Sequence, residues 1–357
     1  MRVCILGAGL SSFALAKALV NKKIHVEIFL KRKKFLINKT RTLGISKSNI
    51  DFFSSKIIDI DKILWKLNKI EIFTDNLSNE ELIKFENKKN YLFSILKNHE
   101  LFNILKKSLK NNKYFKTTYI KNNFNYKNYD LIVNTDYNNP LTQKYFSKKI
   151  IKKYNSFAYT TVIRHKKILN NVATQIFTKK GPIAFLPISE RETSIVYSIH
   201  NSNSKEKENI INLIENKNFK YKIEKINKIE KFELKSLILR SYFHKNILAF
   251  GDLLHKIHPL AGQGFNMTIR DIKTLLQIIQ NKISLGLPLD ANVNLEFEKK
   301  LKHKNLIFSN GVDLIYEIFN LERKINNNIL SKSIQKTLKN PKLNKFFTQI
   351  ADRGIIN

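Results

Sequence analysis

The segment from Gly251 to Asn266 contains the residues of this chain best suited to chemistry. An apolar run at 246–250 precedes it and predicts a buried strand, and the apolar spacing of 265–280 predicts a helix after it. A helix N-terminus offers free N–H groups and a positive dipole end, and glycines admit a flat ligand close to the backbone. Between strand and helix lie a carboxylate, two histidines, a proline and two glycines: Asp252, His255, His258, Pro259, Gly262 and Gly264.

A second glycine motif follows the apolar strand predicted at residues 2–6. Gly7, Gly9 and Ser12 fit the dinucleotide-binding fingerprint, with Ser12 in place of the third glycine. Gly7 serves the sharp turn, and Gly9 admits a pyrophosphate to the N-terminus of the helix predicted at 13–20. Ser12 is small enough for close packing of this helix on the strand. The motif predicts a nucleotide site built on the first strand and helix.

Together these residues resemble the FAD-dependent aromatic-ring hydroxylases, most closely the ubiquinone-biosynthesis branch, with its pattern Gly-Asp-x-x-His-x-x-His-Pro-x-x-Gly-Gln-Gly-x-Asn. The resemblance implies that Asp252, after Gly251, binds the ribityl chain of FAD. It places the loop 259–264 against the isoalloxazine ring and the helix N-terminus at the pyrimidine edge. The implied cofactor-binding residues of this segment are Gly251, Asp252, Gly262, Gln263, Gly264, Phe265 and Asn266; His258 and Pro259 are the catalytic candidates beside the reacting ring.

Other family positions are altered in this chain. The acid that holds the adenosine ribose would end the strand 24–30, where Leu30 stands instead, and Glu27 lies on the other face. Arg41 matches an arginine that contacts FAD in the family, although it is also one of 64 basic residues. Asp136 matches the aspartate of an Asp-Gly motif that serves FAD and the nicotinamide donor. Tyr137 replaces the glycine, and Pro140 and Gln143 replace a serine and an arginine.

The two histidines of the segment allow two interpretations. His255 and His258 could transfer protons, since histidine titrates near neutral pH. A packing or hydrogen-bonding role next to the flavin is the alternative, which we favour for His255. Further resemblance lies in the strand 181–188, near the substrate cavity of the branch, and in helical residues 297–319. We expect no metal, because no cysteine–histidine cluster or carboxylate triad is present.

The expected fold is α/β: a Rossmann-like FAD-binding domain with an inserted β-sheet substrate domain and C-terminal helices. We expect the FAD-binding domain to be discontinuous, with residues 1–65, 95–150 and 236–289. Residues 66–94 and 151–235 are expected to form the substrate domain, and 290–357 a helical region. Residues 93–110 are predicted to be one helix.

The net charge of +35 comes from 64 basic and 29 acidic residues. Lysines are scattered rather than clustered, and no recognition module is visible, so we expect no nucleic-acid partner. The alternatives are a chain-wide compositional bias and attraction to anionic lipid headgroups. No apolar run long enough to cross a membrane and no targeting leader is visible. We therefore expect a cytoplasmic protein, peripheral on the inner face of the membrane. The single Cys4 is expected in the core.

The resemblance implies an FAD-dependent monooxygenase that uses NAD(P)H and O₂. It would hydroxylate the ring of a polyprenylated phenol in ubiquinone biosynthesis through a flavin C4a-hydroperoxide, with other enzymes of that pathway as possible partners. One alternative is a flavin hydroxylase of a small soluble aromatic. The altered residues Leu30, Tyr137 and Gln143 favour another, a degenerate FAD-binding scaffold of a biosynthetic complex.

Overall fold

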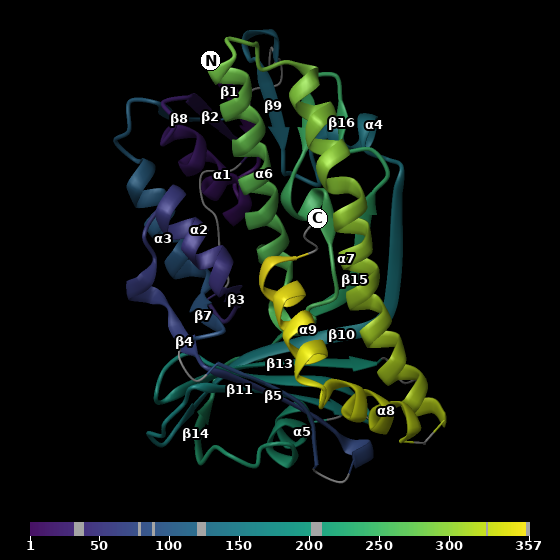
Figure 1. Cartoon of the computed structure of the whole chain (residues 1–357). Coiled ribbons are helices and arrows are strands. Elements are labelled where there is room, and N and C mark those ends of the chain that lie inside the picture. Colours follow the sequence, from purple (N-terminus) through teal and green to yellow (C-terminus); the bar gives the residue numbers. More distant parts are fainter. Residues whose placement is uncertain are drawn as a thin grey trace.

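The computed structural model describes residues 1–31, 39–77, 80–87, 90–119, 126–200, 209–325 and 328–354, the side chains of 127 and 261 excepted. A nucleotide-type sheet lies at one end of the molecule and a large, mostly antiparallel sheet at the other (Figure 1). This mixed α/β architecture confirms the expected fold class.

The nucleotide-type sheet has the strand order β16-β17-β9-β1-β2-β8. Strands β17, β9, β1, β2 and β8 run parallel, so their carboxyl ends meet at one edge, where ligands bind in such sheets. The strands are β1 (Arg2–Leu6), β2 (His25–Leu30), β8 (Phe115–Tyr119), β9 (Leu131–Asn134), β16 (Phe243–His244) and β17 (Ile247–Ala249). Segments far apart in the sequence thus build one ligand edge.

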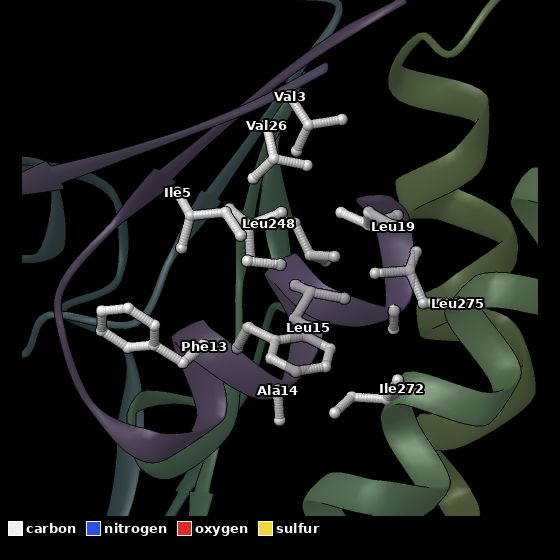
Figure 2. Close-up of a cluster of buried hydrophobic side chains, with 14 of the residues drawn as sticks. Val3, Ile5, Phe13, Ala14, Leu15, Leu19, Val26, Leu248, Ile272 and Leu275 are labelled. Carbon is white, nitrogen blue, oxygen red and sulfur yellow. The ribbon is translucent and has the colours of Figure 1, made fainter. Parts of the chain in front are cut away.

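Helix α1 (Leu10–Val20) crosses one face of this sheet and is buried along most of its length. Figure 2 shows its Phe13, Leu15 and Leu19 among side chains of the strands and of helix α6 (Gly264–Ser284). Its outer flank also packs against α3 (Asn98–Leu109), where Phe13 meets the ring of Phe102 edge to face at 4.8 Å. Burial on every side fixes the start of α1 relative to α6.

The large sheet has the order β18-β15-β10-β13-β12-β11-β5-β6, with β14 paired to β10. Its strands are β5 (Lys69–Thr74), β6 (Glu81–Glu86), β10 (Lys149–His165), β11 (Val172–Thr178), β12 (Gly181–Pro187), β13 (Glu192–His200), β14 (Ile223–Ile226), β15 (Glu230–Leu239) and β18 (His255–Lys256). The domain boundary expected between residues 235 and 236 falls inside β15. The proposed domain limits stay a prediction.

A third, small sheet joins the two ends of the molecule. Its order is β3-β7-β4, from Thr42–Ser46, Phe93–Lys97 and Trp65–Leu67, and helix α2 (Lys47–Lys56) follows β3 directly. The prediction of a single helix at 93–110 was therefore wrong for residues 93–97, and the helix α3 begins at Asn98. Residues 93–97 are a buried strand because Phe93 and Ile95 pack in an apolar cluster with Leu67 and Ala173, and pairing with β3 satisfies their backbone.

The remaining helices lie mainly at the C-terminal end of the sequence. Helix α7 (Ala291–Ile325) runs along the nucleotide-type sheet and the large sheet. Helices α8 (Ile329–Leu338) and α9 (Pro341–Arg353) then turn back toward α6 (Figure 1). Short helices α4 (Pro140–Tyr145) and α5 (Ile210–Asn216) fill connections. Within the described ranges, no helix is both long enough and apolar enough to cross a membrane.

Candidate functional site

Three segments converge at the carboxyl edge of the nucleotide-type sheet. Gly7 has φ +117°, and a Cβ there would lie 2.3 Å from Oγ1 of Thr135 and 3.2 Å from the backbone nitrogen of Asp136. Gly251 has φ +64°, and its Cβ would lie 2.9 Å from Ser11 on the first turn of α1. Neither position tolerates a side chain, so the glycines are needed for this convergence.

The first turn of α1 supplies an open anion site. Gly9 is the N-cap residue, no side chain caps the helix, and no acid lies in its first turn. Among the described residues, a Cβ at Gly9 would meet nothing within 4 Å, so none of them fills the position beside this glycine. Ser12 is fully buried and its hydroxyl lies 2.8 Å from that of Thr135, which brings helix and strand together. This cradle fits a pyrophosphate.

Asp252 is exposed at the same edge, immediately after Gly251, whose φ is +64°. No hydrogen bond or ion pair ties its carboxylate to another described residue. A carboxylate held at a strand end with free acceptor oxygens suits the hydroxyl groups of a ribityl chain.

The N-terminus of α6 is the second open anion site. Gln263 is its N-cap residue and makes no capping hydrogen bond, and no acid lies in the first turn. A Cβ at Gly264 would meet nothing within 4 Å, whereas Gln263 is 5% exposed with its Oε1 lacking a partner among the described residues. The open glycine and the orphaned amide oxygen fit a planar ligand that supplies a donor, as the pyrimidine edge of a flavin does.

Asn266 fixes the loop 259–264 from within the protein. Its Nδ2 donates to the carbonyl oxygens of Gly44 (3.0 Å) and Gly262 (3.3 Å). Its Oδ1 accepts from the backbone N–H of Ser46 (3.0 Å) and from Nδ2 of Asn49 (2.9 Å). Since this fully buried amide is saturated by protein groups, its direct contact with a cofactor stays a prediction, and the geometry makes it a positioning residue.

Gly262 and Phe265 complete the packing of the loop. Gly262 has φ +62°, and its Cβ would approach the backbone of Gly44 at 3.5 Å, so β3 lies directly beneath the loop. Phe265 is 9% exposed and faces Phe53 of α2, with ring centroids 6.4 Å apart. Its aromatic ring belongs to the core.

His255 is held by a buried carboxylate. Its Nε2 lies 2.5 Å from Oδ2 of Asp271 on α6, and Asn305 of α7 donates to the other carboxylate oxygen at 3.2 Å. Both members of the pair are almost completely buried. This arrangement fixes the short strand β18 against α6, as expected for a residue with a packing role.

His258 has a different environment, because neither ring nitrogen has a hydrogen-bond partner among the described residues. It is 1% exposed, and its ring packs against those of Tyr154 (4.8 Å, perpendicular) and Tyr316 (4.5 Å). Burial lowers the pKa of His258 to about 3, so the ring is neutral at physiological pH. Pro259 follows it, half-buried at the start of the loop.

An apolar cluster lies beside this loop, between the large sheet and helices α6 and α7. Leu260 belongs to the loop itself, and the aromatic members come from β10, β11 and α7. The buried members are Tyr154, Ala158, Phe177, Leu234, Ile257, Leu260, Met267, Phe308, Val312 and Tyr316. Apolar and aromatic side chains next to a neutral imidazole fit an aromatic ring better than an ionic substrate.

Polar groups at the far side of this cluster form a connected set. The hydroxyl of Tyr316 lies 2.9 Å from Nε2 of His200, and Ser156 Oγ lies 3.0 Å from the other ring nitrogen. Tyr154 donates to Asp313. Burial, and to a smaller extent Arg323, lowers the pKa of His200 to about 4. A small pocket opens here, lined by residues including Thr74, Phe177, Pro182, His200, Tyr316 and Arg323.

The sequence assigned no role to these tyrosines, His200 or Asp313. Asp313 and Tyr316 lie in the helical stretch 297–319 that resembles the family, whereas Tyr154 and His200 belong to no motif. Helix α7 brings Asp313 and Tyr316 to β10 and β13 from over 100 residues away. For Tyr154 and His200, a position on a long strand predicts a sheet face, but it does not indicate which face lies under the loop.

The adenosine end of the cradle departs from the resemblance. Leu30 is 8% exposed and packs in the core, while Glu27 accepts hydrogen bonds from Thr118 and Tyr129 on the opposite side. Lys31 occupies the strand end, with its Nζ 2.9 Å from the carboxylate of Asp136 and 2.7 Å from the carbonyl oxygen of Asn138. The carboxylate that survives from the Asp-Gly motif is thus paired with a lysine.

The residues after Asp136 build a local structure of their own. Asn139 caps α4 by accepting from the N–H of Leu141 at 3.0 Å, and Pro140 is its first residue, a favourable N-terminal pair. The hydroxyl of Tyr137 accepts from Lys149 at 2.7 Å. Arg41 is exposed just before β3, and no hydrogen bond or ion pair joins its side chain to the described residues of the loop. Its role stays a prediction.

Fold and site together define a flavoprotein-type FAD-binding architecture, which fits at the pyrophosphate, ribityl and flavin positions and is altered at the adenosine. The structure resembles p-nitrophenol 4-monooxygenase PnpA from Pseudomonas putida DLL-E4, with a TM-score of 0.75, 12% identity and 99% and 98% of the two chains covered. Klebsiella pneumoniae HpxO, solved with FAD and uric acid, gives a TM-score of 0.73 at 11% identity, covering 99% and 97%. These likenesses establish the fold.

Residues 133–284 match the family described as FAD binding domain, which confirms FAD as the expected cofactor. The chain is 25% identical over 191 residues to the ubiquinone biosynthesis monooxygenase COQ6 of Danio rerio, covering 42% of this chain and 40% of that protein. It is 29% identical over 152 residues to 3-demethoxyubiquinol 3-hydroxylase of Escherichia coli K12, covering 41% and 39%. The matched regions thus span about two-fifths of these relatives, and the resemblance to the ubiquinone-biosynthesis hydroxylases is confirmed.

Proposed function

We propose that the protein is an FAD-dependent monooxygenase that hydroxylates the ring of a polyprenylated phenol in ubiquinone biosynthesis. The observation that carries this proposal is the position of the apolar cluster against the loop 259–264, with Leu260 shared by both. A phenol ring packed against the side of the cluster formed by Tyr154, Tyr316 and His258 would lie next to the flavin position. The names of the similar COQ6 and 3-demethoxyubiquinol 3-hydroxylase proteins support this class of substrate.

The overall reaction consumes the ring C–H, O₂, NAD(P)H and a proton, and yields the ring C–OH, water and NAD(P)⁺. Bound FAD would take the hydride and activate O₂, which is the chemistry that protein side chains cannot supply. The open N-terminus of α6 stabilises negative charge at the edge of the ligand that it faces. Asp252 holds the cofactor, and Asn266 holds the loop.

The residues around His258 have a separate role in this proposal. Because the imidazole is neutral and buried, it offers one donor and one acceptor to a bound ring without adding charge. Tyr154, Tyr316 and Leu260 exclude water from the reacting carbon. His258 therefore orients the phenol in this mechanism.

The test uses the purified chain loaded with FAD. NAD(P)H oxidation is measured with and without a prenylated phenol, and the product is checked for one added oxygen by mass spectrometry. We expect oxidation coupled to a hydroxylated product, and a loss of that product in Asp252→Ala protein assayed at low FAD. Oxidation without product, or product only with small soluble phenols, would contradict the proposed substrate.

Two other functions remain as competing outcomes of this test. Turnover of a small soluble aromatic would support the alternative hypothesis of a flavin hydroxylase that acts on such compounds. FAD binding with no NAD(P)H oxidation would support a scaffold role, which the Lys31–Asp136 pair and Tyr137 favour because they alter the region expected to serve the nicotinamide donor. In cells, the proposed reaction requires that loss of the gene leaves a ubiquinone precursor lacking one ring hydroxyl.

The proposed substrate also suggests a place of action. A polyprenyl phenol stays in the bilayer, so we propose that the enzyme works peripherally on the inner face of the membrane, together with other enzymes of the pathway. The excess of basic residues, net +35, supports attraction to anionic headgroups.

A further inference from the structure

Helix α9 exposes its apolar side to solvent. Leu343, Phe346 and Phe347 are 39%, 54% and 45% exposed, although their spacing with Ile350 is that of a single apolar stripe on a helix. A helix on the surface of a globular protein normally turns such a stripe toward the core. None of the residues of α9 is fully buried, so this stripe has no cover among the described residues.

The polar side of α9 faces the protein instead. Asn344 donates to the backbone carbonyl of Lys84 at 3.0 Å. Near the other end of the helix, the carboxylate of Asp352 accepts from the N–H of Ser48 at 2.9 Å, and its carbonyl oxygen accepts from the hydroxyl of Ser46 at 2.7 Å. These bonds fix the orientation of the helix, so the outward direction of the apolar stripe is built into the fold.

Basic residues accompany the exposed stripe in this part of the chain. Between Lys324 and Asp352 the sequence contains no aspartate or glutamate. Five exposed lysines lie on α8, on α9 and between them: Lys332, Lys336, Lys339, Lys342 and Lys345. Exposed aromatic and aliphatic side chains flanked by lysines are typical of helices that lie in the interface of an anionic bilayer.

The inner end of the stripe leads to the candidate substrate site. Ile350 is half-buried and packs against the apolar cluster that contains Leu260 and Met267. Leu260 belongs to the loop 259–264, and Met267 lies in the first turns of α6. Through Ile350, the apolar stripe of α9 therefore reaches the apolar cluster beside the loop.

We propose that α9, flanked by the lysines of α8, docks the protein on an anionic lipid bilayer and receives the substrate from it. Phe346 and Phe347 enter the headgroup region, the lysines bind lipid phosphates, and an apolar tail passes along the stripe toward Ile350. A second copy of this chain is a poorer occupant, because pairing two such faces brings ten lysines together. The proposal rests on the proposed function for the nature of the substrate.

The test measures sedimentation of the full, FAD-loaded chain with vesicles of phosphatidylcholine, with or without phosphatidylglycerol. We expect binding only when phosphatidylglycerol is present. The double variant Phe346→Ser, Phe347→Ser should bind at least about tenfold more weakly, since it removes the inserting apolar surface. The matched control Leu169→Ser, Phe219→Ser changes exposed apolar residues of the large-sheet region and should bind like the unaltered protein.

The charge is tested separately. Lys342→Gln, Lys345→Gln should weaken binding about tenfold or more at low salt and much less at high salt. The control Lys106→Gln, Lys110→Gln neutralises two exposed lysines at the end of α3 and should change binding little. A tryptophan placed at Phe347 should shift its emission to the blue on vesicle addition, beyond the constant signal of Trp65.

The proposal is overturned if the unaltered protein binds no vesicles, if the Phe346 and Phe347 variant binds normally, or if either control loses binding equally. A dimer that the double Phe variant abolishes, seen by light scattering without lipid, would also overturn it. Turnover of a phenol with one short prenyl tail, soluble enough to be supplied without vesicles, reports on the proposed function alone. Turnover without docking therefore rejects only this surface, and docking without turnover rejects only the proposed function.

Discussion

The two ends of the candidate FAD site are built in different ways. At the flavin end, the loop 259–264 is fixed by a buried amide with four hydrogen bonds to protein groups, and the sequence pattern of the resembled family is complete. At the adenosine end, a core leucine stands at the expected ribose acid, and Lys31 pairs with Asp136 at the surface.

This difference separates two kinds of requirement. The flavin end must hold a reacting ring within a fraction of an ångström, so its loop is buried and rigid. The adenosine end only adds binding energy. Gaining or losing one hydrogen bond there changes the affinity for FAD but does not move the flavin ring. We therefore expect changes at the flavin end to alter stability and chemistry, and changes at the adenosine end to alter affinity slightly.

The largest effect is expected for Asn266→Ala. The change leaves buried groups of Gly44, Ser46 and Asn49 without their partner, and we expect a loss of roughly 4 kcal/mol in the free energy of unfolding. Urea unfolding measures it. Asn281→Ala, at an exposed position of the same helix, is the control and should change stability by less than about 0.5 kcal/mol. Equal effects would refute the contrast between the two ends.

The next largest effect is expected for Asp252→Ala. Loss of its hydrogen bonds to the ribityl hydroxyls should weaken FAD binding by about 1–3 kcal/mol, or roughly ten- to a hundredfold. Because Asp252 is exposed, the apoprotein should unfold at an unchanged temperature. Flavin fluorescence titration measures the affinity, with Asp51→Ala on α2 as an exposed control. Unchanged FAD affinity in folded Asp252→Ala protein would show that the assignment is wrong.

The buried His258 predicts a pH dependence of stability at the flavin end. Its pKa is about 3 in the folded protein against 6.5 in the unfolded chain, so only the unfolded chain takes up the proton between these values. Stability is therefore complete above pH 6.5 and falls as the pH drops toward 3, by roughly 2 kcal/mol at pH 5.

His258→Phe keeps a ring against Tyr154 and Tyr316 but cannot titrate. The fall in unfolding free energy between pH 6.5 and 5 should be smaller in this variant. His200, whose pKa is lowered to about 4, retains its own contribution of the same sign. Identical pH profiles for the two proteins would contradict the burial of a neutral His258.

The smallest effect is expected for Lys31→Ala at the adenosine end. The Lys31–Asp136 pair is partly exposed, so its loss should change the free energy of unfolding by less than about 1 kcal/mol and FAD affinity by less than about fivefold. The effect should shrink further at high salt. A loss of affinity as large as that of Asp252→Ala would mean that the adenosine end holds the cofactor as firmly as the flavin end.

The sequence was sufficient for the local parts of the site. The glycine turns, the strand at 247–249 and the helix after residue 263 follow from short-range rules on backbone space and apolar spacing. It was also sufficient to mark Leu30 as unusual. Each of these inferences depends on residues within about one turn or strand of each other, where chain geometry limits the outcomes.

The remaining parts depend on contacts between distant segments. Lys31 could not be matched to Asp136 from the sequence, because the two meet only through the parallel pairing of β2, β1 and β9. Asn266 was identified, but its partners on β3 and α2 lie some 220 residues earlier. Residues 93–97 were predicted as part of the helix at 93–110, because a short segment such as Phe93-Ser94-Ile95-Leu96 does not by itself distinguish strand from helix.

The long sequence separations around the loop also determine when its contacts can form during translation. Ser48 is made early, but its partner Asp352 emerges 304 residues later. At about 5–20 residues per second, the ribosome needs roughly 15–60 s to produce that interval. During this time the nascent chain contains the residues of β3 and α2. Asn266 is missing for most of the interval, and Asp352 is missing for all of it. The contacts of Ser46 and Ser48 with Asp352 therefore form only after α9 is made, and β3 and α2 remain without them for roughly 15–60 s.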